Sequence, residues 1–209
     1  MSSLVLLVFG VIALVVGRIV APRRRRSAAT KRLLAGSRQL ADGALVTVIG
    51  VIREPQKLAE SPLSGRRGVF VLASAELPEI DEALGTGEYL VLTSNLLVPF
   101  ELDTGAEVVV VDGTTATTLM RPSAVRPRSE ARERAFLVAH GRGPEVAAAA
   151  TFREVLIVPG TRVAVHGLAR FVEGERTERG YRDAMAANVR IVAPEASPIT
   201  IADPSELNR

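Results

Sequence analysis

The stretch EVLIVPGTRVAVHGLARF, residues 154–171, decides the fold class of this chain. Aliphatic and β-branched residues run up to Pro159 and Gly160, and a second run with Val163 and Val165 follows directly. β-Branched residues favour strands, and Pro-Gly pairs mark turns. The stretch therefore predicts two consecutive strands separated by a turn.

Runs of the same kind occur along most of the chain. They predict further strands at residues 45–52, 69–77, 89–102, 106–113, 181–194 and 199–201, with loops at 53–68 and 78–88 and a turn at 103–105. One helix is predicted between Ser129, after Pro127, and Gly141. Six or seven short strands with one helix predict a mainly β domain, built as a small OB-like barrel, because closure removes free strand edges.

The composition excludes several classes of site. Hydrophobic residues make up 47% of the 209 residues and charged residues 23%, which is typical of a folded protein. The chain has no Cys and two His, so disulfides, a thiol nucleophile and Cys-ligated zinc are impossible. We expect no catalytic, cofactor-binding or metal-binding residues. High Ala and Arg with little Lys indicate a bacterial source.

The basic charge is confined to one short segment. Residues 1–38 hold eight basic residues and no acid, so the remaining 18 basic and 23 acidic residues give a formal charge of −5. A mildly acidic domain with no Trp and two Tyr lacks the basic grooves and aromatic platforms of nucleic-acid binding. No nucleic-acid partner is expected.

The apolar run LVLLVFGVIALVV, residues 4–16, explains the basic segment beside it. With its flanks up to Ala21 it reaches the length that crosses a bilayer, and Pro22 ends it. A cleaved signal peptide would carry its basic residues before the apolar core, whereas here Arg18 and Arg23–Arg26 follow it. A buried core helix is the remaining alternative, which the four consecutive arginines disfavour. We therefore predict a single transmembrane helix.

The positive-inside rule sets the expected topology. It places the N-terminus outside and the domain in the cytoplasm, at the cell membrane, with the arginines beside anionic headgroups. The expected organisation is an anchor at 1–22, a basic linker at 23–41, a domain at 42–203 and a tail at 204–209.

Three stretches together, residues 48–71, 99–111 and 154–170, resemble the GIDE-type domain, also called the beside-a-membrane domain. The shared pattern consists of a strand ending in Gly, a Ser-Pro-Leu-Ser-Gly turn, a hairpin with Phe followed by Asp-x-Gly, and a Glu…Pro-Gly segment before Val-x-Val-x-Gly. Its residues here are Gly50, Ser61, Pro62, Leu63, Ser64, Gly65, Phe100, Asp103, Gly105, Glu154, Pro159, Gly160 and Gly167.

The resemblance implies a membrane-proximal module that binds or recruits proteins. The mitochondrial ubiquitin ligases of that family carry a RING finger with Cys and His zinc ligands, which a chain without Cys cannot form. The resemblance therefore implies a membrane-anchored, non-catalytic adaptor with an unidentified protein partner. Two alternatives remain: a component of a RING-type ligase-like system, and a Ser- or Asp-dependent hydrolase.

The hydrolase alternative depends on a few polar residues. Ser61 and Ser64 are the candidate nucleophiles and His140 and His166 the candidate bases, but the Gly-x-Ser-x-Gly elbow is absent. We expect the serines to form a turn, His140 to cap a helix and His166 to lie on a strand surface.

The remaining carboxylates have structural interpretations. Asp103, in an Asp-Thr-Gly triplet like that of aspartic proteases, is expected to be a hairpin-turn residue. The acidic and basic residues of 173–183 are expected at a solvated hairpin tip, because calcium-ligand spacing is missing. The loop 81–88 lacks the context of a phosphate-binding loop.

Overall fold

The fold is mainly β, with a small barrel and few helices, as the sequence predicts. The computed structural model describes residues 30–31, 33–37, 39–81, 86–172, 189–195 and 197–208, with the backbone alone at 79–81, 86–89 and 208. Within this part of the chain, no helix has the length and apolarity needed to span a bilayer. The predicted anchor, residues 1–22, lies outside the described residues.

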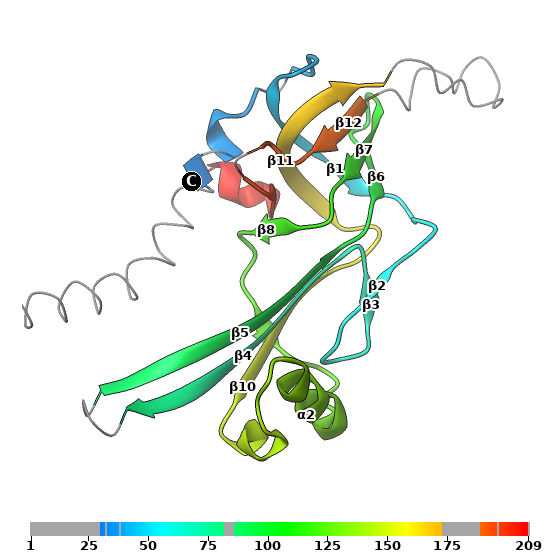
Figure 1. Ribbon diagram of the computed structural model, residues 1–209. Helices are drawn as coiled ribbons and strands as arrows, with labels where there is room; N and C mark the ends of the chain where they lie inside the picture. The colour runs from blue at the N-terminus through cyan, green and yellow to red at the C-terminus, as the bar shows by residue number, and fades with distance from the viewer. Residues whose placement is uncertain are drawn as a thin grey trace, which may run out of the picture.

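Five strands close into the barrel in the upper half of Figure 1. The ring follows the order β1 (Leu45–Ile52), β6 (Phe100–Asp103), β7 (Val108–Asp112), β12 (Val189–Val192) and β11 (Arg162–Phe171). Pairing of β1 with β11 completes the ring. All neighbours are antiparallel except β7 and β12, which are parallel. β13 (Ile199–Ala202) pairs with β11 next to β12, and β8 (Ala116–Thr118) pairs in parallel with β13.

A second sheet runs from the barrel toward the lower half of Figure 1. It has the order β5 (Thr86–Leu97), β4 (Phe70–Asp81), β10 (Thr151–Ile157) and β9 (Ser123–Ala124). The helix α2 (Glu130–Ala139) and the 3₁₀ helix η1 (Pro144–Ala148) pack on one face. We call these elements the helix-covered sheet. The short strands β2 (Ala59–Glu60) and β3 (Arg67–Gly68) flank it, and a second 3₁₀ helix, η2 (Pro204–Asn208), ends the described chain.

Two apolar cores lie on the same long strands. The barrel core is formed by hydrophobic side chains, among them Val46, Leu102 and Ile191. The second core fills the space under α2 and includes Leu63, Leu137 and Phe152. β4 supplies Phe70 to the first core and Ala73 to the second, so one strand connects both regions.

The outer face of β1 and β11 is also covered. The N-terminal segment, residues 30–31 and 33–37, places Leu33 against Leu119, Ala164 and Ala202. Ser37 pairs in parallel with Val46 through two backbone hydrogen bonds. Part of the stretch predicted as a linker therefore packs on the barrel.

The predicted and observed elements differ in several places. The predicted loop 78–88 is shorter, because β4 continues to Asp81 and β5 begins at Thr86. The predicted strand 89–102 is divided between β5 and β6, since Pro99 cannot donate to a strand ladder. The short elements were not predicted, because two to five residues carry too little periodicity; they are β2 and β3 inside the predicted loop 53–68, β8, β9, η1 and η2.

Candidate functional site

Ser61 and Ser64, the two serines of the predicted turn, share one buried carboxylate. Ser61 Oγ donates to Glu154 Oε2 at 2.7 Å, and Ser64 Oγ donates to the same oxygen at 2.9 Å. All three side chains are buried. Glu154 lies on β10, so the contact joins two of the three stretches that carry the family resemblance. Their shared residue pattern has a structural role in this chain.

The serines also build the turn, as the sequence predicts. Ser61 Oγ accepts hydrogen bonds from the backbone N–H groups of Leu63 and Ser64, both at 3.2 Å. Gly65 adopts a φ of 72°, in the left-handed region that favours glycine. Arg132 of α2 holds the turn from outside, donating to Ser61 O at 3.4 Å and to Glu60 Oε1 at 2.9 Å. The turn therefore ties α2 to β10.

His140 caps α2 and contacts the hairpin strand β5. Its two ring nitrogens lie 2.8 Å from Phe136 O and 3.1 Å from Thr93 O. A neutral imidazole can donate to only one of these carbonyls at a time. The predicted capping position is confirmed, and the contact with Thr93 is additional.

His166 is buried, so the prediction of a strand-surface position is wrong. Only 3% of the residue is exposed, and its Nδ1 lies 3.1 Å from Thr47 Oγ1. Thr47 Oγ1 also lies 2.7 Å from Leu33 O, to which it donates. Strand alternation correctly directs His166 away from the barrel core, but the N-terminal segment covers that outer face. In these contacts neither His140 nor His166 reaches Ser61 or Ser64, so neither acts as a base for them.

Asp103 lies at the β6–β7 turn, as predicted. Its Oδ1 accepts from Gly105 N at 2.9 Å, and its Oδ2 accepts from Arg53 Nη2 at 2.8 Å. The hydrogen bond from Arg53, together with the backbone N–H of Gly105, holds the pKa of this carboxyl below its ordinary value. The Asp-Thr-Gly triplet is thus an ion-paired hairpin turn.

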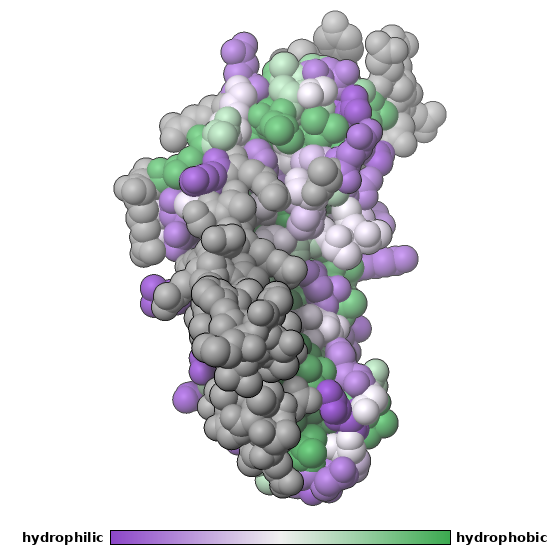
Figure 2. Space-filling view, turned by 60° about the vertical axis from the view of Figure 1, so that its left-hand side comes forward, coloured by the Kyte–Doolittle hydropathy of each residue, from purple (hydrophilic) through white to green (hydrophobic). Residues whose placement is uncertain are grey.

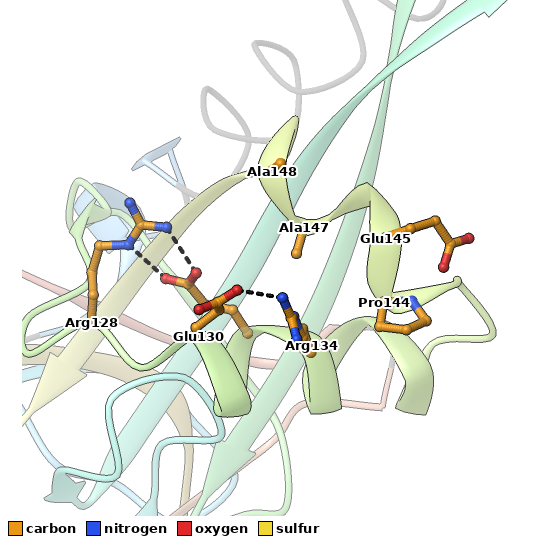
Figure 3. A pocket seen from close by; sticks show the side chains of 8 residues that line it. Arg128, Glu130, Arg134, Pro144, Glu145, Ala147 and Ala148 are labelled. Atoms are coloured by element: carbon orange, nitrogen blue, oxygen red, sulfur yellow. Dashed lines mark hydrogen bonds and ion pairs between the residues drawn. The ribbon is translucent and has the colours of Figure 1, made fainter.

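A charged hollow beside α2 was not predicted. It has a volume of about 400 Å³ and is lined by residues of α2 and η1 and by Arg128. Figure 3 shows Arg128 and the Glu130–Arg134 pair on one wall, with Glu145 across from them. Arg128 makes two hydrogen bonds to the buried Glu133, at 2.7 and 2.8 Å. These bonds raise the pKa of the Arg128 guanidinium. The arginines here are already paired within the protein.

A second hollow lies on the barrel surface and has a volume of about 590 Å³. Pro55, Pro99, Phe100 and Val110 supply apolar surface, and Glu54, Lys57 and Glu101 supply charge. An adjoining hollow of about 380 Å³ shares residues 54–57. The charges are mixed, so the shape, rather than a dominant charge, distinguishes this site.

The outer edge of β5 is not paired with any other described strand, and Asn95 Nδ2 near its end donates to Ala116 O of β8. β5 pairs with β4 from Thr86 to Leu97, and no other described strand pairs with it. Val98 N donates to Val69 O, so the residues that exchange hydrogen bonds with β4 are the even-numbered ones. Val91 and Thr93 therefore direct their backbone groups outward, in agreement with the His140–Thr93 contact.

The remaining charged and metal-ligating residues of the described chain form no further site. Among the described residues, no cluster of three or more His, Asp and Glu side chains could hold a metal ion. The charged residues at 173–183 and the acidic loop at 82–85 lie outside the described part of the chain.

No family model matches this chain, and no curated protein or solved structure is significantly similar to it. The resemblance to the GIDE-type domain therefore stays a prediction.

Proposed function

We propose that this protein is a membrane-anchored, non-catalytic binding module that recruits a protein partner through an extended peptide segment of that partner. The anchor is the apolar stretch at 4–16, followed by Arg23–Arg26, which orients the domain toward the cytoplasm. The domain is proposed to be OB-like and related to the GIDE type. The strand order with one parallel pair, β7 with β12, supports an OB-like barrel.

The open edge of β5 carries the proposal. An extended peptide can add to such an edge through backbone hydrogen bonds, with affinity from the main chain and selectivity from side chains. Val91, which directs its N–H and C=O outward, is 53% exposed. Leu96, on the same strand, is a second exposed apolar side chain. Natural proteins usually shorten, cover or charge an edge of this length, and a binding site is one reason to leave it open.

His140 partly covers this edge of β5. Its ring lies against Thr93 O, one of the outward carbonyls that an added strand would use. A bound peptide would replace this contact with a backbone hydrogen bond. The surface hollow beside Pro99 and Phe100 is a separate depression on the barrel and is not needed for strand addition.

A peptide-selection experiment tests this function. The full chain in detergent micelles is used to select from a displayed random-peptide library, and binding of the selected peptide is then measured by titration. Val91→Pro removes an outward N–H while leaving the β4–β5 ladder intact, so we expect loss of binding. The matched control Val91→Thr keeps the N–H and should bind normally. Equal binding by both variants would place the peptide elsewhere, and turnover of a substrate by the purified chain would contradict a non-catalytic role.

Membrane anchoring is tested separately. We expect the chain to stay in the membrane pellet after alkaline carbonate extraction, and protease added outside sealed cells to leave the domain intact. Release by carbonate would remove the anchor from the proposal, and external digestion of the domain would reverse the topology.

A further inference from the structure

One end of the barrel combines exposed hydrophobic and basic side chains. Leu45 and Phe171 are 50% and 48% exposed. Arg170, beside Phe171 on β11, is exposed as well. Figure 2 shows the side from which the described N-terminal segment begins, and hydrophobic residues bordered by hydrophilic ones gather at its barrel end.

Backbone contacts hold these residues in one place. Ala169 N donates to Ala44 O, and Gly43 N donates to Ala169 O, both at 2.9 Å, which brings residues 43–45 beside the end of β11. Phe171 N donates to Asp42 Oδ1 at 2.9 Å. Ser37 N donates to Leu45 O at 3.0 Å, which brings the end of the N-terminal segment here, while Leu33 packs further along the outer face on Ala164 and Ala202.

The occupant of this surface follows from where the described chain begins. Thr30 is the first described residue, and Pro22 ends the apolar stretch, so only residues 23–29 separate the two. Seven residues span at most about 25 Å, even when fully extended. If the apolar stretch crosses the bilayer, the barrel therefore cannot move far from the headgroups. Amphipathic surfaces with Leu, Phe, Lys and Arg are typical of membrane-interface contacts.

We propose that this barrel end rests on the anionic surface of the bilayer, with Leu45 and Phe171 inserted among the headgroups. Arg170 contacts the lipid phosphates, and one carboxylate oxygen of Asp42 accepts a hydrogen bond from Phe171 N. The inference rests on the proposed membrane anchor. In this orientation α2 points away from the membrane, since it lies at the opposite end of the molecule (Figure 1).

The chain lacks Trp, so a single introduced Trp reports on one position. The full chain is reconstituted into phosphatidylcholine–phosphatidylglycerol liposomes that contain lipids brominated near the headgroup, which quench nearby Trp fluorescence. Phe171→Trp and Leu45→Trp should lose most of their fluorescence. Val138→Trp is the matched control, because Val138 on α2 is 58% exposed and apolar but lies at the other end, and it should keep its fluorescence. Omitting phosphatidylglycerol should reduce the quenching at Phe171→Trp.

Flotation of the same liposomes separates the two proposals. If the chain floats with the liposomes but Phe171→Trp is quenched no more than Val138→Trp, the anchor stands and the surface contact is wrong. Equal quenching of Phe171→Trp with and without phosphatidylglycerol would overturn the anionic contact. If the chain does not float, the membrane anchor of the proposed function fails.

Discussion

The barrel and the helix-covered sheet differ in how their strand edges and buried polar groups are treated. In the barrel, pairing of β1 with β11 closes the ring around a hydrophobic core, and the buried polar residues Thr47 and His166 lie on its outer face under the N-terminal segment. The helix-covered sheet leaves β5 with an open edge, and it buries two carboxylates, Glu154 and Glu133, beneath its turn and helix.

The comparison suggests different roles for the two regions: the barrel supports, and the edge of the helix-covered sheet is free to bind. A closed ring offers no free ladder to another chain, so it provides a rigid base. The open sheet cannot be closed by pairing, and instead its covering elements are attached by specific hydrogen bonds to buried acids. The Ser61–Glu154 and Arg128–Glu133 contacts fasten the turn at 61–65 and α2 in this way. The edge of β5 is then held in place with no described strand paired to it, although His140 contacts it at Thr93 O.

The largest expected effect comes from core truncation in each region. Leu102→Ala in the barrel and Leu137→Ala under α2 remove fully buried leucines, and each should cost about 2–5 kcal/mol. Because β4 contributes to both cores, we expect one cooperative unfolding transition in each variant. Urea titration of the full chain in micelles, with hydrogen exchange, measures this. Loss of protection in α2 alone, for Leu137→Ala, would show that the two regions unfold separately.

Removing the shared acid should have the next largest effect. Glu154→Ala leaves the buried hydroxyls of Ser61 and Ser64 without their acceptor and should cost about 1–3 kcal/mol. Glu154→Gln retains one oxygen acceptor and should cost less. The exposed Glu101→Ala serves as a control, expected within about 0.5 kcal/mol of the parent chain. Equal stability of Glu154→Ala and the parent would mean that the carboxylate does not fasten the turn.

A pair of glycines tests the attachment of α2 to the turn. Gly65 and Gly105 have φ values of 72° and 87°, so Ala at either position should cost about 1–2 kcal/mol. At Gly65 a Cβ would also lie 2.9 Å from Arg132 Cζ, whereas nothing lies within 4 Å at Gly105. Gly65→Ala should therefore be the more destabilising change when thermal midpoints are compared. Arg132→Ala in both backgrounds should remove the excess, and an excess that persists would have another cause.

The smallest effect is expected at the barrel turn, where Asp103 is solvent-accessible. Its pKa is lowered in the folded state, so its stabilising contribution is complete above the unfolded value of about 3.9 and is lost as pH falls through the folded pKa. Asp103→Asn should be slightly less stable than the parent at neutral pH and equally stable in strong acid. An NMR titration of the carboxyl measures the pKa directly, and Arg53→Ala should return it toward its ordinary value. An unchanged pKa in that variant would exclude the ion pair as the cause.

Much of the local structure follows from the sequence. β1 occurs at Leu45–Ile52 as predicted, because its β-branched run is bounded by turn residues. α2 follows Ser129 and ends before Gly141, as predicted, although the Ser129 side chain makes no capping hydrogen bond in the structure. The hairpin turn after Asp103 was predicted because Asp and Gly are common turn residues. In the candidate site, the turn role of Ser61 and Ser64 was predicted, but their carboxylate partner was not.

What the sequence by itself determined is therefore most of the longer strands, the helix, the turns and the apolar stretch at the start of the chain, since each depends on neighbouring residues. Only the tertiary structure decided that Glu154 meets Ser61 across 93 positions, that β1 closes on β11, and that the N-terminal segment buries His166. Alternation along a strand tells which side chains share a face, but not what covers that face. Covering and closure depend on contacts between distant segments, which no local pattern of residues encodes.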